Sequence, residues 1–286
     1  MVGAAQGAGR ALMRWLITGA GGMLGRDLQS VLQGSDVVAA TRADLDISDL
    51  SAVERAVDRA DVVINAAAWT DVDGAETAES QATAINGHGA ANLAAVAGKR
   101  LIHVSTDYVF DGSARSPIPE DAARAPINAY GRSKAAGEAA VLAAGGFVVR
   151  TAWLYGEHGP NFVRTMLRLA ATRDTVDVVD DQQGPPTWSY ALARQLVALG
   201  RSSAAPGVYH GTAAGSTTWF GLARAVFEEA GLDPARVRPT TSDQFVRPAR
   251  RPAYSVLGHA RWAEADIDPL EDWRSMLTAA MPVLRP

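Results

Sequence analysis

The sequence predicts an α/β fold in which a doubly wound parallel sheet is joined by a smaller, interleaved C-terminal lobe. Three observations predict this fold. Short apolar runs alternate with helical patterns through the first half of the chain, and a glycine-rich turn directly follows the first run. After about residue 153 the elements become shorter, and proline and glycine become frequent. Apolar runs of this kind are typical of parallel strands that are covered by helices on both faces.

The order of the runs predicts where each element lies. Strands of the sheet are expected at residues 15–18, 37–40, 62–65, 101–105 and 147–150. Helices are expected between them at 23–33, 48–59, 79–97 and 129–144, with Ser48 as the N-cap of the second. Later helices are expected at 161–172, 189–200 and 217–230, and later strands at 176–179 and 208–210. These elements predict a first domain at 13–155 and a lobe at 156–286, with segments near 176–200 returning to the first domain.

The composition is that of an ordinary globular protein and excludes several classes of function. Of the 286 residues, 48% are hydrophobic and 20% are charged, which suits a sizeable core. The net charge of -4 and the lack of a long basic run argue against a nucleic-acid-binding protein. The chain has no cysteine, so disulfides and thiolate metal sites are excluded, and its five histidines are scattered. We therefore expect no bound metal.

The sequence also bears on location. No apolar run approaches the roughly 20 residues that a membrane-spanning helix requires. The stretch from Met1 to Leu12 is rich in glycine and alanine and lacks the apolar core of a secretory signal. We therefore expect a disordered tail at 1–12 and a cytoplasmic protein without a membrane partner.

A glycine motif opens the first expected helix. Gly19, Gly22 and Gly25 follow the first strand with the spacing G-x-x-G-x-x-G. The first glycine permits a tight turn, the second lets the backbone approach a pyrophosphate, and the third lets helix and strand pack closely. A nucleotide-triphosphate loop would continue with Lys and Ser or Thr, whereas Arg26 and Asp27 follow here. The motif therefore predicts a Rossmann-like dinucleotide site, with the pyrophosphate at the helix N-terminus.

The end of the second strand predicts which dinucleotide is bound. An acidic residue there would bind the ribose hydroxyls of NAD, but the chain has Thr41 and Arg42. This pair leaves space and positive charge for a 2′-phosphate, so NADPH is expected, with NADH possible; a solvated Arg42 is the alternative. Asp46 and Ile47 are placed to contact the adenine. Small side chains after the third strand allow a close approach of the backbone to the cofactor, or simply pack helix on sheet; they are Ala66, Ala67 and Ala68.

Tyr130 and Lys134 lie one turn apart on the helix expected at 129–144. A nearby ammonium would lower the pKa of the tyrosine from about 10 and suit it to proton exchange. Thr106, at the end of a buried strand, adds a hydroxyl. Phenol, ammonium and hydroxyl together suit the reduction of a carbonyl group if a hydride donor is bound nearby. The spacing Tyr-x-x-x-Lys also occurs in solvated surface pairs.

Several strings of residues occur in one order and resemble a known family. They are the glycine motif, residues 65–68, Ser-Thr-Asp-Tyr-Val-Phe-Asp-Gly at 105–112, Tyr-x-x-x-Lys at 130–134, Arg-Thr-Ala-Trp-Leu-Tyr-Gly at 150–156 and Val-Asp-Asp-Gln-Gln-Gly-Pro-Pro-Thr at 179–187. The chain resembles the extended short-chain dehydrogenases/reductases and, among them, the dTDP-4-dehydrorhamnose reductases. The resemblance runs from about Met13 to about Leu270.

The resemblance implies an NADPH-dependent reduction of the 4-keto group of dTDP-4-dehydro-6-deoxy-L-mannose to dTDP-L-rhamnose. It implies that Tyr130 donates a proton to the keto oxygen and that Lys134 holds the nicotinamide ribose. Thr106 would bond the same oxygen, Thr106 and Asp107 would hold the sugar, and Trp153 would pack against it. The second lobe would bind the substrate. The implied cofactor-binding residues are Gly19, Gly22, Met23, Leu24, Gly25, Thr41, Arg42, Asp46, Ile47, Ala66, Ala67, Ala68, Val104, Tyr130 and Lys134.

Other interpretations remain open at this stage. Trp153 could be a core aromatic residue and Asp107 could cap a turn. Another dTDP-linked keto- or aldehyde-sugar could be the substrate, as for dihydrostreptose synthases, and a nucleotide-sugar epimerase is a weaker alternative. A different class is a non-catalytic nucleotide-binding regulatory subunit. Some family members share magnesium between subunits, but Trp188-Ser189-Tyr190 offers no carboxylate opposite Asp27, so we expect a monomer without metal.

Overall fold

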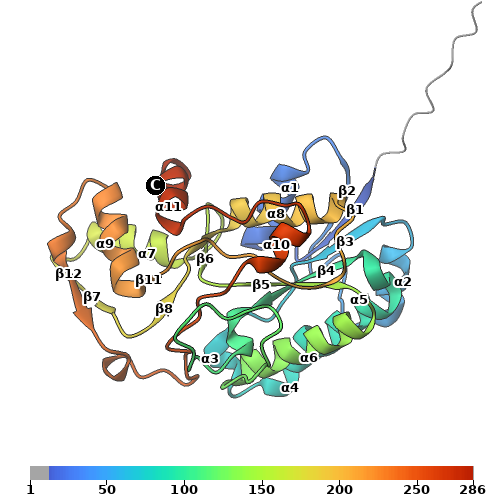
Figure 1. Cartoon of the computed structure of the whole chain (residues 1–286), viewed down its shortest axis with the longest axis horizontal. Coiled ribbons are helices and arrows are strands. Elements are labelled where there is room, and N and C mark those ends of the chain that lie inside the picture. The colour runs from blue at the N-terminus through green and yellow to red at the C-terminus, as the bar shows by residue number, and fades with distance from the viewer. Residues whose placement is uncertain (1–12, 286) are drawn as a thin grey trace, which may run out of the picture.

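A six-stranded, wholly parallel sheet forms the centre of the larger lobe (Figure 1). The computed structural model describes residues 13–285, so the tail expected at 1–12 lies outside the described residues. The strand order is β10-β5-β4-β3-β1-β2. The strands are β1 (Arg14–Thr18), β2 (Asp36–Ala40), β3 (Val62–Asn65), β4 (Leu101–Thr106), β5 (Phe147–Thr151) and β10 (Gly207–His210).

Both faces of the sheet are buried, which is why its strands are continuous apolar runs. Successive side chains of β1 alternate between two cores: Trp15 and Ile17 lie in one, and Leu16 lies in the other. The first core is closed by α1 (Met23–Val31) and α8 (Ser189–Arg201). The second is closed by α2 (Leu50–Val57), α5 (Ala90–Ala97) and α6 (Ala129–Ala143), on the opposite side in Figure 1.

Two helices differ from the sequence-based expectation. The N-cap of α2 is Asp49, not Ser48, because the Asp49 carboxylate accepts a hydrogen bond from the Ala52 N–H. The helix expected at 79–97 is divided into α4 (Glu79–Thr83), a π-helical segment η1 (Ala84–Gly89) and α5. Here α6 packs closely: a Cβ on Gly137 would lie 2.2 Å from the Asn86 carbonyl oxygen. A π-helical turn depends on such tertiary contacts, so the helical pattern alone did not predict it.

The smaller lobe packs helices around a short parallel pair of strands (Figure 1). β7 (Val176–Val179) pairs with β12 (Val237–Thr240), and the core beneath them includes Leu222, Val226 and Leu277. The helices of this lobe are α7 (Phe162–Ala170), α9 (Trp219–Glu229) and α11 (Trp273–Leu284). Because α8 and β10 of the larger lobe lie between β7 and β12 in sequence, the two lobes are interleaved.

Short elements complete the described chain. Two small pairs join β6 (Leu154–Tyr155) to β9 (Thr187–Trp188) and β8 (Gln183–Gly184) to β11 (Thr217–Thr218). The short helices are α3 (Val72–Ala75), α10 (Ala260–Glu264), and the 3-10 turns η2 (Gly98–Arg100), η3 (Asp107–Val109), η4 (Pro234–Arg236) and η5 (Ser242–Gln244). None of the helices within residues 13–285 is long and apolar enough to cross a membrane.

The strand order places a crevice beside β1. The chain passes from β1 outward to β2 and then returns to β3 on the other side of β1. In open parallel sheets such a reversal leaves a crevice at the carboxyl ends of the two strands. These ends are Thr18 and Asn65, which lie opposite each other in register. The glycine turn and the segment after β3 therefore meet at this crevice.

Candidate active site

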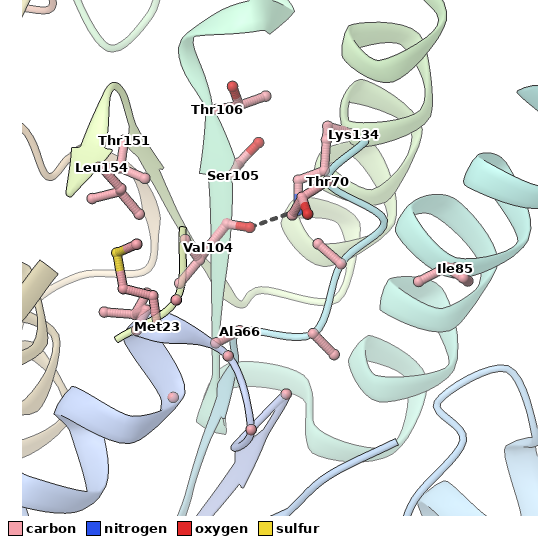
Figure 2. Close-up of a pocket in the computed structure, with 18 of the residues that line it drawn as sticks. Met23, Ala66, Thr70, Ile85, Val104, Ser105, Thr106, Lys134, Thr151 and Leu154 are labelled. Atoms are coloured by element: carbon pink, nitrogen blue, oxygen red, sulfur yellow. Dashed lines mark hydrogen bonds between the residues drawn. The ribbon is translucent and has the colours of Figure 1, made fainter. Parts of the chain in front are cut away.

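A cavity of about 1060 Å³ lies at the carboxyl edge of the sheet and reaches the second lobe at Trp219. Every site residue expected from the sequence lines it, from the glycine turn to Trp153. Figure 2 shows Met23 on α1, Val104 and Thr106 on β4, and Lys134 on α6 around this cavity. The fold thus brings together residues that are far apart in sequence.

The glycine turn is shaped by close contacts between backbones. Gly19 has a φ of 69°, and a Cβ on it would lie 2.5 Å from the Ala67 nitrogen. A Cβ on Gly25 would lie 2.3 Å from the Gly19 carbonyl oxygen. Gly22 is the N-cap of α1 and makes no side-chain cap, so the first N–H groups of the helix face the cavity without a capping side chain. This arrangement fits a pyrophosphate.

The segment after β2 lines the other end of the cavity. The Asp44 carboxylate accepts hydrogen bonds from the Thr41 backbone N–H at 2.9 Å and from its hydroxyl at 2.6 Å. Asp46 accepts similarly from the backbone and hydroxyl of Ser48. Arg42 is exposed and lines the cavity. The Thr41 hydroxyl and the Asp46 carboxylate therefore organise this loop, a role that sequence reasoning did not predict.

The N-terminus of α6 is held in place from three directions. The Asn128 side chain caps the helix by accepting from the Gly131 N–H at 2.8 Å, and its amide donates to the Arg250 carbonyl at 2.8 Å. Glu76 accepts from the Ala129 N–H at 2.8 Å. A Cβ on Gly131 would lie 2.1 Å from the Tyr108 carbonyl oxygen, so only glycine permits this approach. These contacts set the position of Tyr130 beside β4.

The expected lowering of the Tyr130 pKa is wrong for this structure. Burial and then the Asp107 carboxylate raise the pKa of the phenol, while the Thr106 hydroxyl opposes them. The Lys134 Nζ instead donates to the Val104 carbonyl oxygen at 2.7 Å, the contact drawn as a dashed line in Figure 2. Burial also lowers the pKa of Lys134, to about 8. Tyr130 is consequently a protonated phenol near neutral pH.

Thr106 and Asp107 form a small polar cluster at the end of β4. The Thr106 hydroxyl donates to Asp107 Oδ1 at 3.0 Å and accepts from the Tyr108 N–H at 3.1 Å. Thr106, rather than Asp107, thus caps the turn η3. Within residues 13–285, Asp107 Oδ2 is buried without a hydrogen-bond partner. Burial raises the pKa of this carboxyl to about 6, and the hydroxyls of Ser255 and Thr106 oppose the rise. A buried acceptor of this kind suits a ligand hydroxyl, which would supply the missing donor.

Two tryptophans form the wall of the cavity on the side of the second lobe. The rings of Trp153 and Trp219 stack with centroids 3.6 Å apart and planes 6° apart. A Cβ on Gly184 would lie 2.5 Å from the Trp153 ring, so this glycine makes space for the indole. Trp153 is therefore partly exposed, and it is not a fully buried core residue. Trp219 covers one face of its ring, so a ligand could contact only the other face. Sequence reasoning missed Trp219, since only its position in the folded lobe marks it.

A buried ion pair between Glu138 and Arg150 holds α6 against the sheet next to the site. Glu138, on α6 one turn beyond Lys134, accepts hydrogen bonds from the Arg150 guanidinium at 2.8 and 2.9 Å and from the Ser105 hydroxyl at 2.7 Å. Glu138 is 0% exposed and Arg150 is 2% exposed. The pair thus joins α6 to β4 and β5. The sequence contained both residues, but only the folded chain brings them together.

The cavity has further lining residues that the sequence did not single out. Thr151 has a buried hydroxyl that finds no hydrogen-bond partner in the part of the chain that the structure describes. Thr70 precedes α3, and Val72 is its first residue. Ile85 and Leu154, both labelled in Figure 2, also line the cavity. These are ordinary apolar or hydroxyl side chains, and no sequence pattern marks them as functional.

Asp27 takes part in a buried hydrogen bond between α1 and the start of α8. The Ser189 hydroxyl donates to Asp27 Oδ2, and His158 Nε2 lies 3.9 Å from Oδ1. Burial raises the pKa of Asp27. Within the described residues, no group of three or more His, Cys, Asp or Glu is arranged to hold a metal ion.

Comparison with known proteins shows the family of this chain. The model of the RmlD substrate binding domain family matches residues 13–285. The chain belongs to this family. The match covers the whole described chain, so both lobes are included.

Individual relatives are similar over nearly their full length. The chain is 54% identical to a dTDP-4-keto-6-deoxy-D-glucose reductase of Streptomyces niveus, over 95% of this chain and 97% of the relative. It is 51% identical to a dTDP-4-dehydrorhamnose reductase of Streptomyces griseus, over 95% of this chain and 94% of the relative. The crystal structure of a dTDP-4-dehydrorhamnose reductase from Bacillus anthracis in complex with NADP has a TM-score of 0.91 and 37% identity, covering 95% of this chain and 99% of that one.

The buried Asp107 carboxylate predicts an unusual dependence of stability on pH. The folded pKa is raised from 3.8 to about 6, so ionisation destabilises the fold. This penalty is absent below about pH 4, grows between about pH 4 and 6, and is complete above pH 6. We expect Asp107→Asn to raise the free energy of unfolding by ~1–3 kcal/mol at pH 8 and to leave it unchanged at pH 4. Urea unfolding at several pH values measures this.

Asp111→Asn is the matched control. Asp111 is exposed, and hydrogen bonds from the Ser113 backbone and hydroxyl lower the pKa of its carboxyl. Its ionised form therefore stabilises the fold above the unfolded pKa, and the control variant should be less stable than wild type at pH 8. An Asp107→Asn variant that gains no stability at pH 8 would contradict the penalty assigned to Asp107.

Proposed function

We propose that this protein reduces the 4-keto group of dTDP-4-dehydro-6-deoxy-L-mannose to give dTDP-L-rhamnose, with NADPH as the reductant. The coarser statement is established by its family: the chain is a reductase of dTDP-linked 4-keto deoxysugars. The observation that carries the finer proposal is the convergence of Tyr130, Lys134 and Thr106 on one cavity with the glycine turn.

The choice of NADPH rests on two observations. A relative with a TM-score of 0.91 was crystallised with NADP. In this chain, Arg42 lines the cavity just after β2 and is exposed, where a 2′-phosphate would need a cation. The residues proposed to hold the dinucleotide are the glycine turn from Gly19 to Gly25, Arg42, the alanines at 66–68, and Lys134.

In the proposed reaction the bound nicotinamide supplies the hydride, and the side chains handle the oxygen that becomes a hydroxyl. Tyr130 donates its phenolic proton to that oxygen, a role suited to a phenol whose raised pKa keeps it protonated. The Thr106 hydroxyl, which donates to Asp107 Oδ1 in this structure, turns to donate to the same oxygen and stabilises its developing negative charge. Asp107 Oδ2 accepts a hydrogen bond from a sugar hydroxyl. Trp153 is held in position by its stacking on Trp219, and it limits the orientations that the sugar ring can adopt.

A second candidate substrate has a specific observation in its favour. The relative from Streptomyces niveus, at 54% identity, is a dTDP-4-keto-6-deoxy-D-glucose reductase. The two sugars differ in the configuration of ring carbons, so they would meet the same carbonyl-reducing groups and differ in contacts near Asp107 and Trp153. Sugars of other deoxysugar pathways remain within the same class.

A substrate panel tests the proposal directly. The protein is mixed with NADPH or NADH and each dTDP-4-keto-6-deoxysugar, prepared enzymatically, and the loss of nicotinamide absorbance is followed. We expect the highest kcat/KM with the L-mannose-configured ketosugar. Faster reduction of the D-glucose-configured sugar would favour the second candidate. Absence of turnover with every sugar, while NADPH still binds, would favour a non-catalytic nucleotide-binding protein.

Tyr130→Phe is expected to lower kcat by about 10²–10⁴-fold, because proton donation to the oxygen is lost. The Kd for NADPH, measured by fluorescence titration, should change less than about threefold. Tyr108→Phe is the matched control, since Tyr108 lines the same cavity with its ring 5.7 Å from that of Tyr130. A Tyr130→Phe enzyme of full activity would remove this phenol from the mechanism.

Arg42→Ala is expected to weaken NADPH binding by roughly 10-fold and NADH binding by less than about twofold. The reason is that only NADPH carries the 2′-phosphate that the guanidinium would pair with. Arg55→Ala, an exposed arginine on α2 that does not line the cavity, serves as the control. Equal losses for the two cofactors would refute the assignment of Arg42 to the phosphate.

A further inference from the structure

A chain of buried hydrogen bonds runs beneath the catalytic lysine. It begins at Thr18, whose hydroxyl donates to Asn65 Oδ1 at 2.6 Å. Asn65 Nδ2 lies 2.9 Å from His103 Nδ1, and His103 Nε2 lies 3.2 Å from Lys134 Nζ. All four side chains are at most 2% exposed, so water does not replace these partners. The chain joins the carboxyl ends of β1, β3 and β4 to α6.

One backbone group determines the direction of the whole chain. The Ala67 N–H lies 3.1 Å from Asn65 Oδ1 and can only donate. Oxygen must therefore occupy this position of the Asn65 amide, and the NH₂ group must face His103. Because an amide NH₂ can only donate, His103 Nδ1 must accept. A neutral imidazole that accepts at Nδ1 carries its proton on Nε2.

The proton on His103 Nε2 determines which form of Lys134 can accept a hydrogen bond. The Nε2–H of His103 points at Nζ, and an ammonium has no lone pair with which to accept a hydrogen bond. An uncharged amine has one, and it can still donate to the Val104 carbonyl oxygen at 2.7 Å. We propose that His103 acts as a positioning residue that shifts Lys134 toward the uncharged amine in the cofactor-free protein, and that binding of the dinucleotide shifts it back to the ammonium.

Burial acts in the same direction as the hydrogen bonds. It lowers the pKa of His103 well below its usual range, with Lys134 as a second cause, so the imidazole is neutral. It also lowers the pKa of Lys134 to about 8, opposed by Glu138. Lys134 is not among the groups that shift the pKa of Tyr130: burial and the Asp107 carboxylate raise it, and only the Thr106 hydroxyl opposes them.

The other charged groups around α6 have partners of their own. Glu138 is bonded to Arg150 and Ser105 and pairs with Arg124, so its charge is largely compensated, although it still favours the ammonium of Lys134. Asp107, at the end of β4, bonds Thr106. On the helices packed against α6, the titratable groups are paired, bonded to backbone or exposed: Glu79 pairs with Arg132, Asp73 with Arg251, Glu76 accepts from the Ala129 N–H, and His88 is exposed.

Only the second half of this proposal, the change of Lys134 to the ammonium when the dinucleotide binds, rests on the proposed function. The hydroxyls of a bound ribose and the charge of the pyrophosphate would give Lys134 new acceptors and favour the ammonium. The charge that assists Tyr130 would then exist only when the reductant is present. The first half concerns the free protein, and it can be tested without turnover.

The first experiment reads the tautomer of His103 in the wild-type protein. The protein is labelled with ¹⁵N-histidine, and the ring nitrogens are observed by long-range ¹H–¹⁵N correlation at about pH 9, without cofactor, where a lysine with a pKa of about 8 is mostly uncharged. The His103 signals are assigned by their loss in His103→Gln. We expect a proton on Nε2 and none on Nδ1. A proton on Nδ1, with or without one on Nε2, would overturn the proposal.

The second experiment measures the pKa of Lys134 itself. The chain has two lysines, Lys99 and Lys134, and Lys99 is exposed. In a Lys99→Arg background, ¹³C-labelled lysine therefore gives one side-chain signal, whose shift with pH reports the pKa. We expect a midpoint near the value of about 8 given by burial. A midpoint at or above about 10, the value of a solvated lysine, would overturn the proposal.

The sign of a substitution separates the two possible directions of the hydrogen bond. In His103→Gln the amide can turn its oxygen toward Nζ, so the pKa of Lys134 should rise by roughly one. If His103 instead accepts from an ammonium, the substitution leaves the pKa unchanged or lowers it, and the proposal is wrong. His210→Gln is the matched control, because His210 is also buried but contacts Arg150. An equal rise of the Lys134 pKa in His210→Gln would mean that either substitution loosens the packing around Lys134. That result would also overturn the proposal.

Calorimetry of NADPH binding tests the second half. At about pH 8.5, in two buffers of different ionisation enthalpy, we expect uptake of close to one proton per NADPH bound in wild type and much less in His103→Gln. Binding without proton uptake in wild type would overturn the switch. Absence of NADPH binding would instead count against the proposed function, and the two NMR measurements would still decide the state of Lys134.

Discussion

The close packing of α6 against η3, η1 and the sheet is the constraint on which the site depends. Gly131 brings the N-terminus of this helix against the Tyr108 carbonyl, and Gly137 brings its middle against the Asn86 carbonyl. The buried pair of Glu138 and Arg150 then joins the helix to β4 and β5. Breaking a buried ion pair by removing one partner is strongly destabilising, so the pair also fixes the relative positions of these elements. Tyr130 and Thr106 face one cavity because of this packing.

The second lobe contributes shape more than charge. Its stacked tryptophans, Trp153 and Trp219, close the cavity opposite α6. The lobe is tied back to α6 by the Arg250 carbonyl, which accepts from the cap residue Asn128, and to α3 by Arg251, which pairs with Asp73. A substrate held between the lobes would therefore meet polar groups from the sheet and apolar walls from the lobe.

The polar groups of the site are held at some cost in stability. Asp107 Oδ2 is buried without a partner, and Lys134 is buried where its charged form is disfavoured. Such unsatisfied or shifted groups are concentrated where a ligand would complete their hydrogen bonds. They lie at the ends of central strands and in the first turns of α6.

The sequence by itself determined the architecture and most of the cavity. Apolar runs predicted the central strands to within a residue or two, because strands buried on both faces must be apolar, and glycine spacing predicted the turn after β1 because only glycine fits there. It could not determine groups that depend on contacts between distant segments. Asn65, His103 and Lys134 are separated by 38 and 31 residues, so the direction of their hydrogen bonds, and with it the charge of Lys134, exists only in the folded chain. The stacking partner Trp219 and the π-helical turn were decided by tertiary packing for the same reason.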